Sequence, residues 1–363
     1  MANTGILRPS SAHIWINCPG YPTLAATLPP EAPSDPAREG TCAAWVAEMV
    51  LTGAAPDTNA MIGQQHENGW LVDRAMARHI QGYVDMLRAY RGPVQAERRV
   101  TLNSLIAGTP DSFAVCSDGM LRVDDLKYGY EIVEPSTPQV LIYAGALYRM
   151  LIGNGVVITS VRLGIYQPRA FHPSGIYRYR SMTVAELTAA IERVERAGEA
   201  TQSPMAMCIS GPHCRRCDAA AKCSAVAHEV YRAVTQMHHA QERHMTATEM
   251  ARELDFLDMA EAMFKGRRDA VHAEAEARMQ RGEAIVGWHM EQGYGQRRWK
   301  FNAATVAMMT GVDPTAGKMV TPAELERNGA DPDIVASLTE VPRLKAKLKP
   351  VPEGFLAQKF GGI

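Results

Sequence analysis

The sequence predicts an α/β fold in which helices flank a mixed central β-sheet. Several segments in the middle of the chain alternate apolar and polar residues with the period of two that strands require. Two strong helix starts lie among them. Thr137-Pro138 combines an N-cap with a proline at the first helical position, and Thr183-x-x-Glu186 has the form of a capping box. Strands and helices in this order imply a sheet with helices packed on it.

The first part of the chain, to about residue 91, is expected to be mostly helical. Asp35-Pro36 opens a helix over residues 37–51, and Thr52-Gly53 ends it. Residues 70–90 repeat apolar side chains at helical spacing, and Gly92-Pro93 stops that pattern.

The middle part is expected to form the sheet. The predicted strands cover residues 94–102, 106–117, 120–127, 156–166 and 176–180, and the predicted helices cover 137–152 and 183–199. After a cysteine-rich segment, charged helices are expected at 226–242 and 246–281. We therefore divide the chain into a core (1–225), a helical segment (226–284) and a small α/β appendage (285–363).

The composition is typical of a globular protein whose positive and negative charges nearly balance. The 363 residues are 46% hydrophobic and 21% charged, with a formal net charge of −1, which excludes intrinsic disorder. Because the charges balance, contact with nucleic acid would have to come from local basic patches, such as Arg215-Arg216 or residues 297–300.

Neither a secretory signal nor a membrane span is expected. Residues 1–10 lack a basic region followed by an apolar run. The most apolar stretch, 140–163, is broken by Arg149 and by Gly153-Asn154-Gly155. We therefore expect a cytoplasmic protein, in which the seven cysteines stay reduced and form no disulfide framework.

Three charged residues form a candidate metal site. Asp125 and Lys127 lie two apart in a predicted strand and project to the same face. Asp111 lies on the neighbouring strand of the hairpin. Two carboxylates and a backbone carbonyl make an all-oxygen site suited to Mg²⁺ or Mn²⁺, which activates water and neutralises phosphodiester charge. Taken alone, an Asp-x-Lys tripeptide is more often a salt bridge on a solvated sheet face.

Further polar residues surround this site in a recognisable order. Gln139 and Tyr143 lie four apart on one face of the next helix, and Glu39 lies near the start of an earlier helix. The order Glu…Gly-x-x-Asp…Asp-x-Lys…Gln-x-x-x-Tyr resembles the RecB-like branch of the PD-(D/E)XK nuclease superfamily. Residues 10–20 (Ser-Ser-Ala-His-x-Trp-x-Asn-Cys-Pro-Gly) and Glu39-Gly40-Thr41 are similar to a phage-encoded family of this branch.

The resemblance implies a restriction-endonuclease-like core and a Mg²⁺- or Mn²⁺-dependent deoxyribonuclease. The expected enzyme is an exonuclease acting in phage or mobile-element DNA replication or recombination, in the host cytoplasm. Asp111 and Asp125 would bind the metal, the carbonyl of Leu126 would add a ligand, and Lys127 would serve the attacking water.

The same resemblance assigns supporting roles and partners. Gln139 and Tyr143 would support the site or hold the DNA backbone, and Glu39 would lie beside the metal. The implied partners are DNA and a single-strand-binding or annealing protein.

One departure from the family pattern opens an alternative. Relatives carry a histidine five residues after the first-helix glutamate, where this chain has Ala44. His66, in a predicted loop, is the candidate substitute. The missing ligand allows a second function: a catalytically inactive nuclease fold that binds DNA or acts as a scaffold.

A cysteine cluster forms a second candidate site. Cys214, Cys217 and Cys223 have the spacing C-x₂-C-x₅-C, which suits metal binding but leaves the fourth ligand open between Cys18 and Cys208. The resemblance to iron–sulfur members of the RecB-like branch implies Cys18 and a [4Fe–4S] cluster that joins the two ends of the nuclease core. Zn²⁺ is the alternative cofactor.

Overall fold

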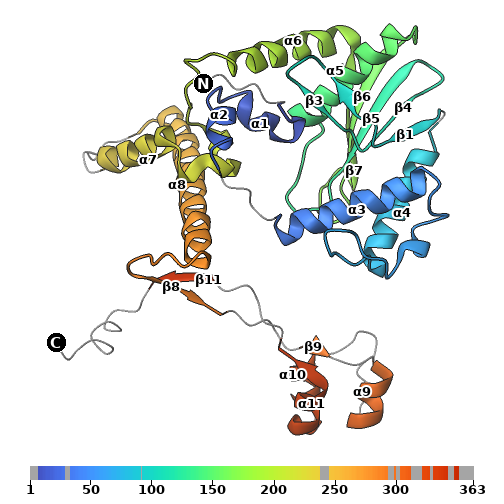
Figure 1. Ribbon diagram of the computed structural model, residues 1–363, viewed down its shortest axis with the longest axis vertical. Coiled ribbons are helices and arrows are strands. Elements are labelled where there is room, and N and C mark those ends of the chain that lie inside the picture. The colour runs from blue at the N-terminus through green and yellow to red at the C-terminus, as the bar shows by residue number, and fades with distance from the viewer. Residues whose placement is uncertain are drawn as a thin grey trace. The chain divides into compact units, whose positions relative to one another are not determined.

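The protein is described by a computed structural model that places residues 7–28, 33–90, 92–237, 245–292, 298–299, 303–311, 321–327, 330–341 and 347–350. Within them, a five-stranded mixed sheet carries helices on both faces, as Figure 1 shows. The predicted α/β class, with a mixed central sheet flanked by helices, is confirmed.

The strands of the central sheet are β1 (Val94–Ala96), β4 (Ser112–Val115), β5 (Met120–Leu126), β6 (Ser160–Tyr166) and β7 (Tyr177–Thr183). Their spatial order is β1-β4-β5-β6-β7. β5 and β6 run parallel, and the other neighbours run antiparallel. A parallel pair needs a crossover connection, and the helix between β5 and β6 supplies it.

The helices on the sheet are α3 (Asp35–Leu51), α4 (Arg74–Arg88), α5 (Pro138–Gly153) and α6 (Val184–Ala200). Side chains of α5 and α6 share one apolar core with Val123 of β5, whereas those of α3 and α4 share a second core with Leu126. Because side chains of a strand alternate between faces, Asp125 projects to the α5 face and Asp124 to the α4 face.

The start of α6 shows the predicted capping contact, whereas Thr137 precedes α5 without a side-chain cap hydrogen bond. Thr183 and Glu186 form the expected capping box at the start of α6. The second helix begins later than expected, because Asp73 caps α4 by accepting the backbone N–H of Met76 at 2.7 Å.

The predicted strand over residues 94–102 is interrupted. β1 ends at Ala96, and Glu97 follows with φ of 49°, a backbone region that non-glycine residues seldom adopt. The chain then enters β2 (Val100–Thr101), which pairs with β3 (Ala107–Gly108) in a separate two-stranded sheet. Alternation alone could not locate this break.

The N-terminal segment packs against the core through short helices that we did not predict. α1 (Ala12–Trp15) buries Trp15 almost completely, and a turn containing Cys18 joins it to α2 (Tyr21–Ala25). Ahead of them, Leu7 forms a parallel bridge with Ile106 beside β3.

By its contacts the chain divides into two compact units, Met1–Arg267 and Arg268–Ile363. The first unit also holds α7 (Ser224–Met237) and the start of α8 (Ala247–Gln280). The division into 1–225, 226–284 and 285–363 stays a prediction. Across the described ranges, no helix is both long and apolar enough to cross a membrane.

Among its described residues, the second unit contains the end of α8, two short strand pairs and three short helices. Its elements are β8 (Trp288–Glu291), β9 (Arg298–Trp299), α9 (Ala303–Thr310), α10 (Pro322–Arg327), α11 (Pro332–Leu338), β10 (Thr339–Glu340) and β11 (Lys347–Pro350). β8 pairs with β11, and β9 with β10. Of the predicted basic patch 297–300, residues 297 and 300 lie outside the described residues.

Candidate active site

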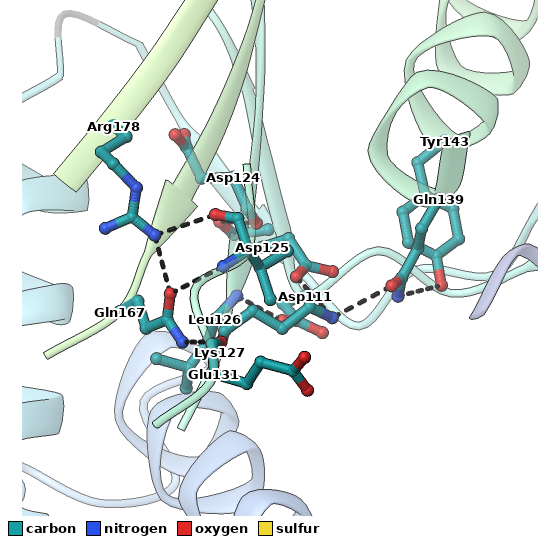
Figure 2. A network of polar contacts seen from close by, with 12 residues as sticks. Asp111, Asp124, Asp125, Leu126, Lys127, Glu131, Gln139, Tyr143, Gln167 and Arg178 are labelled. Carbon is teal, nitrogen blue, oxygen red and sulfur yellow. Dashed lines mark hydrogen bonds and ion pairs between the residues drawn. The ribbon is translucent and has the colours of Figure 1, made fainter. Parts of the chain in front are cut away.

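The predicted carboxylates and the amine meet at the end of β5 (Figure 2). Lys127 Nζ lies 2.8 Å from Asp125 Oδ2, and the side chain of Asp125 is 1% exposed whereas that of Lys127 is 27% exposed. Asp111 stands just before β4, and its Oδ2 accepts the backbone N–H of Leu126 at 2.6 Å. We call Asp111 and Asp125 the carboxylate pair.

The two side chains of the carboxylate pair repel each other when both are ionised. Burial, and next the charge of Asp125, raise the pKa of Asp111 well above its usual range, although Lys127 and the Leu126 N–H act against this rise. Burial lowers the pKa of Lys127, but the two carboxylates outweigh it, so that the pKa is raised. Lys127 therefore carries its charge at neutral pH.

The oxygens of Asp125 fit a hard cation. Apart from the ion pair with Lys127, neither Oδ1 nor Oδ2 receives a hydrogen bond, although both are buried. Because only Oδ2 has a partner, the buried carboxylate keeps part of its desolvation cost. A divalent ion bound by oxygen ligands would relieve that cost. Within the described ranges, no three His, Cys, Asp or Glu side chains are preassembled around one ion.

The predicted Gln139 and Tyr143 extend the site onto α5. Lys127 Nζ donates to Gln139 Oε1 at 3.0 Å, and Gln139 Nε2 donates to the Tyr143 hydroxyl at 3.3 Å. Asp125, Lys127, Gln139 and Tyr143 thus form one continuous chain of polar contacts, drawn in Figure 2.

The loop after Lys127 is fastened by a residue that sequence reasoning missed. Gln167, fully buried directly after β6, donates to the carbonyls of Gly129 and Glu131 and accepts the N–H of Val133. Arg178 also donates to Gln167 Oε1 at 2.7 Å. A buried amide with every partner satisfied holds this loop in one conformation. No pattern in the sequence marks Gln167 as special.

A third carboxylate near the pair was also missed. The backbone N–H of Glu97 donates to the carbonyl of Asp111 at 3.3 Å. Burial, then the charges of Glu48 and Asp125, raise the pKa of Glu97 to about 7. Among the described residues Glu97 is the single non-glycine residue with positive φ, and such strained positions cluster at functional sites.

Glu39 lies elsewhere on α3. Its Oε2 is 2.6 Å from Arg169 Nη1, and the Arg169 guanidinium stacks over the rings of Tyr128 (4.7 Å) and Tyr130 (4.1 Å). None of the interactions of the described residues joins Glu39 to the carboxylate pair. Its place beside a metal stays a prediction, and the structure puts it against the loop that follows Lys127.

Among the described residues, no histidine contacts the carboxylate pair in place of the one that the resemblance implied at position 44. Ala44 lies half-buried on α3. The ring of His66 packs against Trp45 with centroids 5.3 Å apart, and His66 Nδ1 accepts the backbone N–H of Asn68 at 3.1 Å. In the part of the chain that is described, no interaction links His66 to Asp111 or Asp125.

The structure does bring distant cysteines together. Cys18 and Cys214 both influence the thiol of Cys217, and burial is the main cause of the raised pKa there. Backbone N–H groups point at sulfur: that of Ile209 at Cys18 Sγ and that of Gly211 at Cys214 Sγ, each at 3.3 Å. Such donors stabilise thiolates, the form that binds metals.

Cys208 belongs to the same cluster. Its thiol is within hydrogen-bonding reach of both Cys18 and Cys223, and burial followed by these neighbours raises its pKa. Both candidates for the fourth ligand therefore lie at one site. We call Cys18, Cys208, Cys214, Cys217 and Cys223 the thiol cluster.

The chain matches a known protein family and is similar to a solved structure. Residues 5–350 match the model of a family described as "Protein of unknown function (DUF2800)". The chain belongs to the DUF2800 family. Among solved structures, this DUF2800 chain is similar to a crystal structure from Eubacterium rectale named "Putative exonuclease". The two are 12% identical, with a TM-score of 0.32, and the match covers 55% of this chain and 82% of the other.

Proposed function

We propose that the protein is a metal-dependent DNA nuclease of the RecB-like PD-(D/E)XK type, with a restriction-endonuclease-like core. The observation that carries this proposal is the buried carboxylate of Asp125 beside Asp111: its Oδ1 receives no hydrogen bond, and its Oδ2 has only the ion pair with Lys127. Asp111, Asp125 and the carbonyl of Leu126 would hold Mg²⁺ or Mn²⁺. The bound ion would supply a water of lowered pKa and neutralise charge on the phosphodiester.

Lys127 acts in this proposal as a positive charge and hydrogen-bond donor. Because the carboxylate pair raises its pKa in the metal-free protein, Lys127 is protonated there at neutral pH. A partly exposed ammonium next to the reacting phosphate would orient the attacking water and stabilise negative charge on phosphorus oxygens.

Gln139, Tyr143 and Glu39 act as positioning residues. Gln139 holds the Lys127 ammonium at 3.0 Å and is itself linked to Tyr143. Glu39 anchors Arg169 on the two tyrosines that follow Lys127. Each would fix the direction of a group at the site without touching the metal.

The thiol cluster would hold a cofactor of structural importance. We propose a [4Fe–4S] cluster on Cys18, Cys214, Cys217 and Cys223, with Zn²⁺ as the alternative. The support is the convergence of the N-terminal and C-terminal thiols and the backbone donors aimed at two of them. Such a site links segments almost two hundred residues apart and stabilises the fold as a crosslink.

A second candidate function follows from Ala44 and the Lys127–Asp125 ion pair. Without the family histidine the site has fewer ligands, and the ammonium already compensates one carboxylate. A protein with this site would bind DNA and leave it intact.

Digestion of end-labelled linear DNA and of covalently closed circular DNA decides between the two. Anaerobically purified protein is incubated with Mg²⁺, with Mn²⁺, or with a chelator. A nuclease degrades DNA in the two metals and not in chelator, and an exonuclease spares the circle. Binding of both DNAs without cleavage in either metal would contradict the nuclease and support the inactive subunit.

A further inference from the structure

A polar cavity of about 470 Å³ opens beside the candidate active site. Its lining comes from the N-terminal segment, from the strands before Asp111, and from α5. The lining residues are Arg8, Pro9, Ser10, Arg99, Ala107, Gly108, Thr109 and Tyr143. We call this cavity the arginine groove.

The arginine groove carries two positive charges and has no acidic side chain in its lining. Arg8 and Arg99 are both exposed, and the lining contains no Asp or Glu. None of the ion pairs formed by the described residues uses either arginine. Guanidinium groups bind phosphate oxygens through paired hydrogen bonds, and the hydroxyls of Ser10 and Thr109 add donors to the same cavity.

The groove adjoins the proposed reaction centre. Tyr143, which lines it, receives a hydrogen bond from Gln139, which in turn accepts one from Lys127. Thr109 and Gly108 come just before Asp111 in the chain. The hydrogen bonds from Lys127 to Gln139 and from Gln139 to Tyr143 therefore lead from the ammonium to the lining of the groove.

Close packing at Gly108 fixes the wall of the groove. A Cβ at this position would lie 2.8 Å from Pro9 Cγ and 2.9 Å from Tyr143 Cε1, closer than carbon atoms tolerate. The N-terminal segment and α5 can meet here because the residue is glycine. Arg8 therefore directly precedes a residue, Pro9, that is closely packed against Gly108.

We propose that the arginine groove binds the phosphodiester backbone of a DNA strand whose scissile phosphate lies at the carboxylate pair. Arg8 and Arg99 would each contact a phosphate, and Ser10, Thr109 and Tyr143 would donate hydrogen bonds to the same strand. The inference rests on the proposed nuclease function and extends it, because it assigns the path of the strand on one side of the site.

The test measures DNA binding without cleavage. The full-length protein, in chelator, is titrated with a fluorescein-labelled single strand over a range of salt concentrations. The double variant Arg8→Ala/Arg99→Ala should bind roughly tenfold or more weakly. The slope of log affinity against log salt should fall by about 1.4, because two phosphate contacts with a single strand are lost.

A second pair of arginines provides a matched control. Arg74 and Arg78 line another cavity of about 500 Å³, together with Asn59, Ile62 and Gln81. Arg74→Ala/Arg78→Ala removes the same charge from a cavity whose lining includes none of the Lys127–Gln139–Tyr143 chain. Its affinity and salt slope should stay close to those of the wild type, and thermal midpoints should show that both double variants fold.

Two results would overturn the proposal: an unchanged salt slope in Arg8→Ala/Arg99→Ala, or equal losses in the two double variants. The cleavage assay separates this from failure of the nuclease proposal. If the wild type cleaves DNA but Arg8 and Arg99 do not contribute to DNA binding, only the groove proposal is rejected. If DNA binding depends on Arg8 and Arg99 but the protein cleaves no DNA, the nuclease proposal is rejected and the groove remains a DNA-binding site.

Discussion

Asp111 Oδ2 lies 2.6 Å from the backbone nitrogen of Leu126, so that one carboxylate of the site is held by the peptide that follows the other carboxylate. The antiparallel pairing of β4 with β5 produces this arrangement, since Ser112 lies opposite Asp124. Two like charges are thereby kept close in a buried place, which is unfavourable without a bound cation. The proposed metal ion would relieve this repulsion.

Asp111→Asn should therefore stabilise the metal-free protein. The amide removes the repulsion with Asp125, and its oxygen can still accept the Leu126 N–H. We expect a gain of about 1 kcal/mol or more in the free energy of unfolding, measured by chemical denaturation in chelator. The exposed Asp118→Asn is the control, with little change. A loss of stability in Asp111→Asn would show that the carboxylate is well compensated without metal.

Glu97 should make the stability of the metal-free protein depend on pH. Its pKa in the folded state is about 7, above the 4.5 of an unperturbed glutamate. A raised pKa favours the folded state when the group is protonated, so this contribution is present below about pH 4.5 and is lost as the pH rises to about 7. As the pH rises from about 4.5 to about 7, the thermal midpoint of Glu97→Gln should fall less than that of the wild type. Parallel curves would contradict the account.

Gln167→Ala should destabilise the protein and lower its activity. The change removes a buried amide that pairs with the backbone groups of Gly129, Glu131 and Val133 and with the buried Arg178. We expect a loss of about 2–3 kcal/mol in the free energy of unfolding and slower cleavage, because Lys127 precedes this loop. The exposed Gln95→Ala serves as control and should change stability little. Wild-type stability in Gln167→Ala would contradict the assigned role.

Serine substitutions should identify the cofactor of the thiol cluster. Replacing Cys18, Cys214, Cys217 or Cys223 should each remove iron and visible absorption from anaerobically purified protein, whereas Cys208→Ser and the distant Cys116→Ser should retain both. Loss of iron in Cys208→Ser with retention in Cys18→Ser would show that Cys208, and not Cys18, is the fourth ligand. A colourless wild type with stoichiometric zinc would refute the iron–sulfur proposal.

The parts of the site that follow chain periodicity could be predicted from sequence. Asp125 and Lys127 share a face because strand side chains alternate, and Gln139 meets Tyr143 because residues four apart adjoin on a helix. The capping box at Thr183 predicted the start of α6 because its hydrogen bonds join residues only three apart in the chain.

The remaining parts depend on tertiary contacts that no local pattern records. Glu97 reaches the carboxylate pair only because the chain turns there with a positive φ. Gln167 acts through a loop almost forty residues earlier in the chain. Glu39 pairs with Arg169, far away in sequence, which the expected place beside a metal did not anticipate.

Cleavage by active-site variants shows whether the carboxylate pair and Lys127 catalyse DNA hydrolysis. End-labelled linear DNA is incubated in Mn²⁺ with wild type, Asp125→Asn, Lys127→Met and the control Asp118→Asn, at matched DNA binding in chelator. We expect Asp125→Asn and Lys127→Met to lose cleavage by about a hundredfold or more, and Asp118→Asn to cleave like the wild type. Undiminished cleavage by Asp125→Asn and Lys127→Met would contradict this catalytic role.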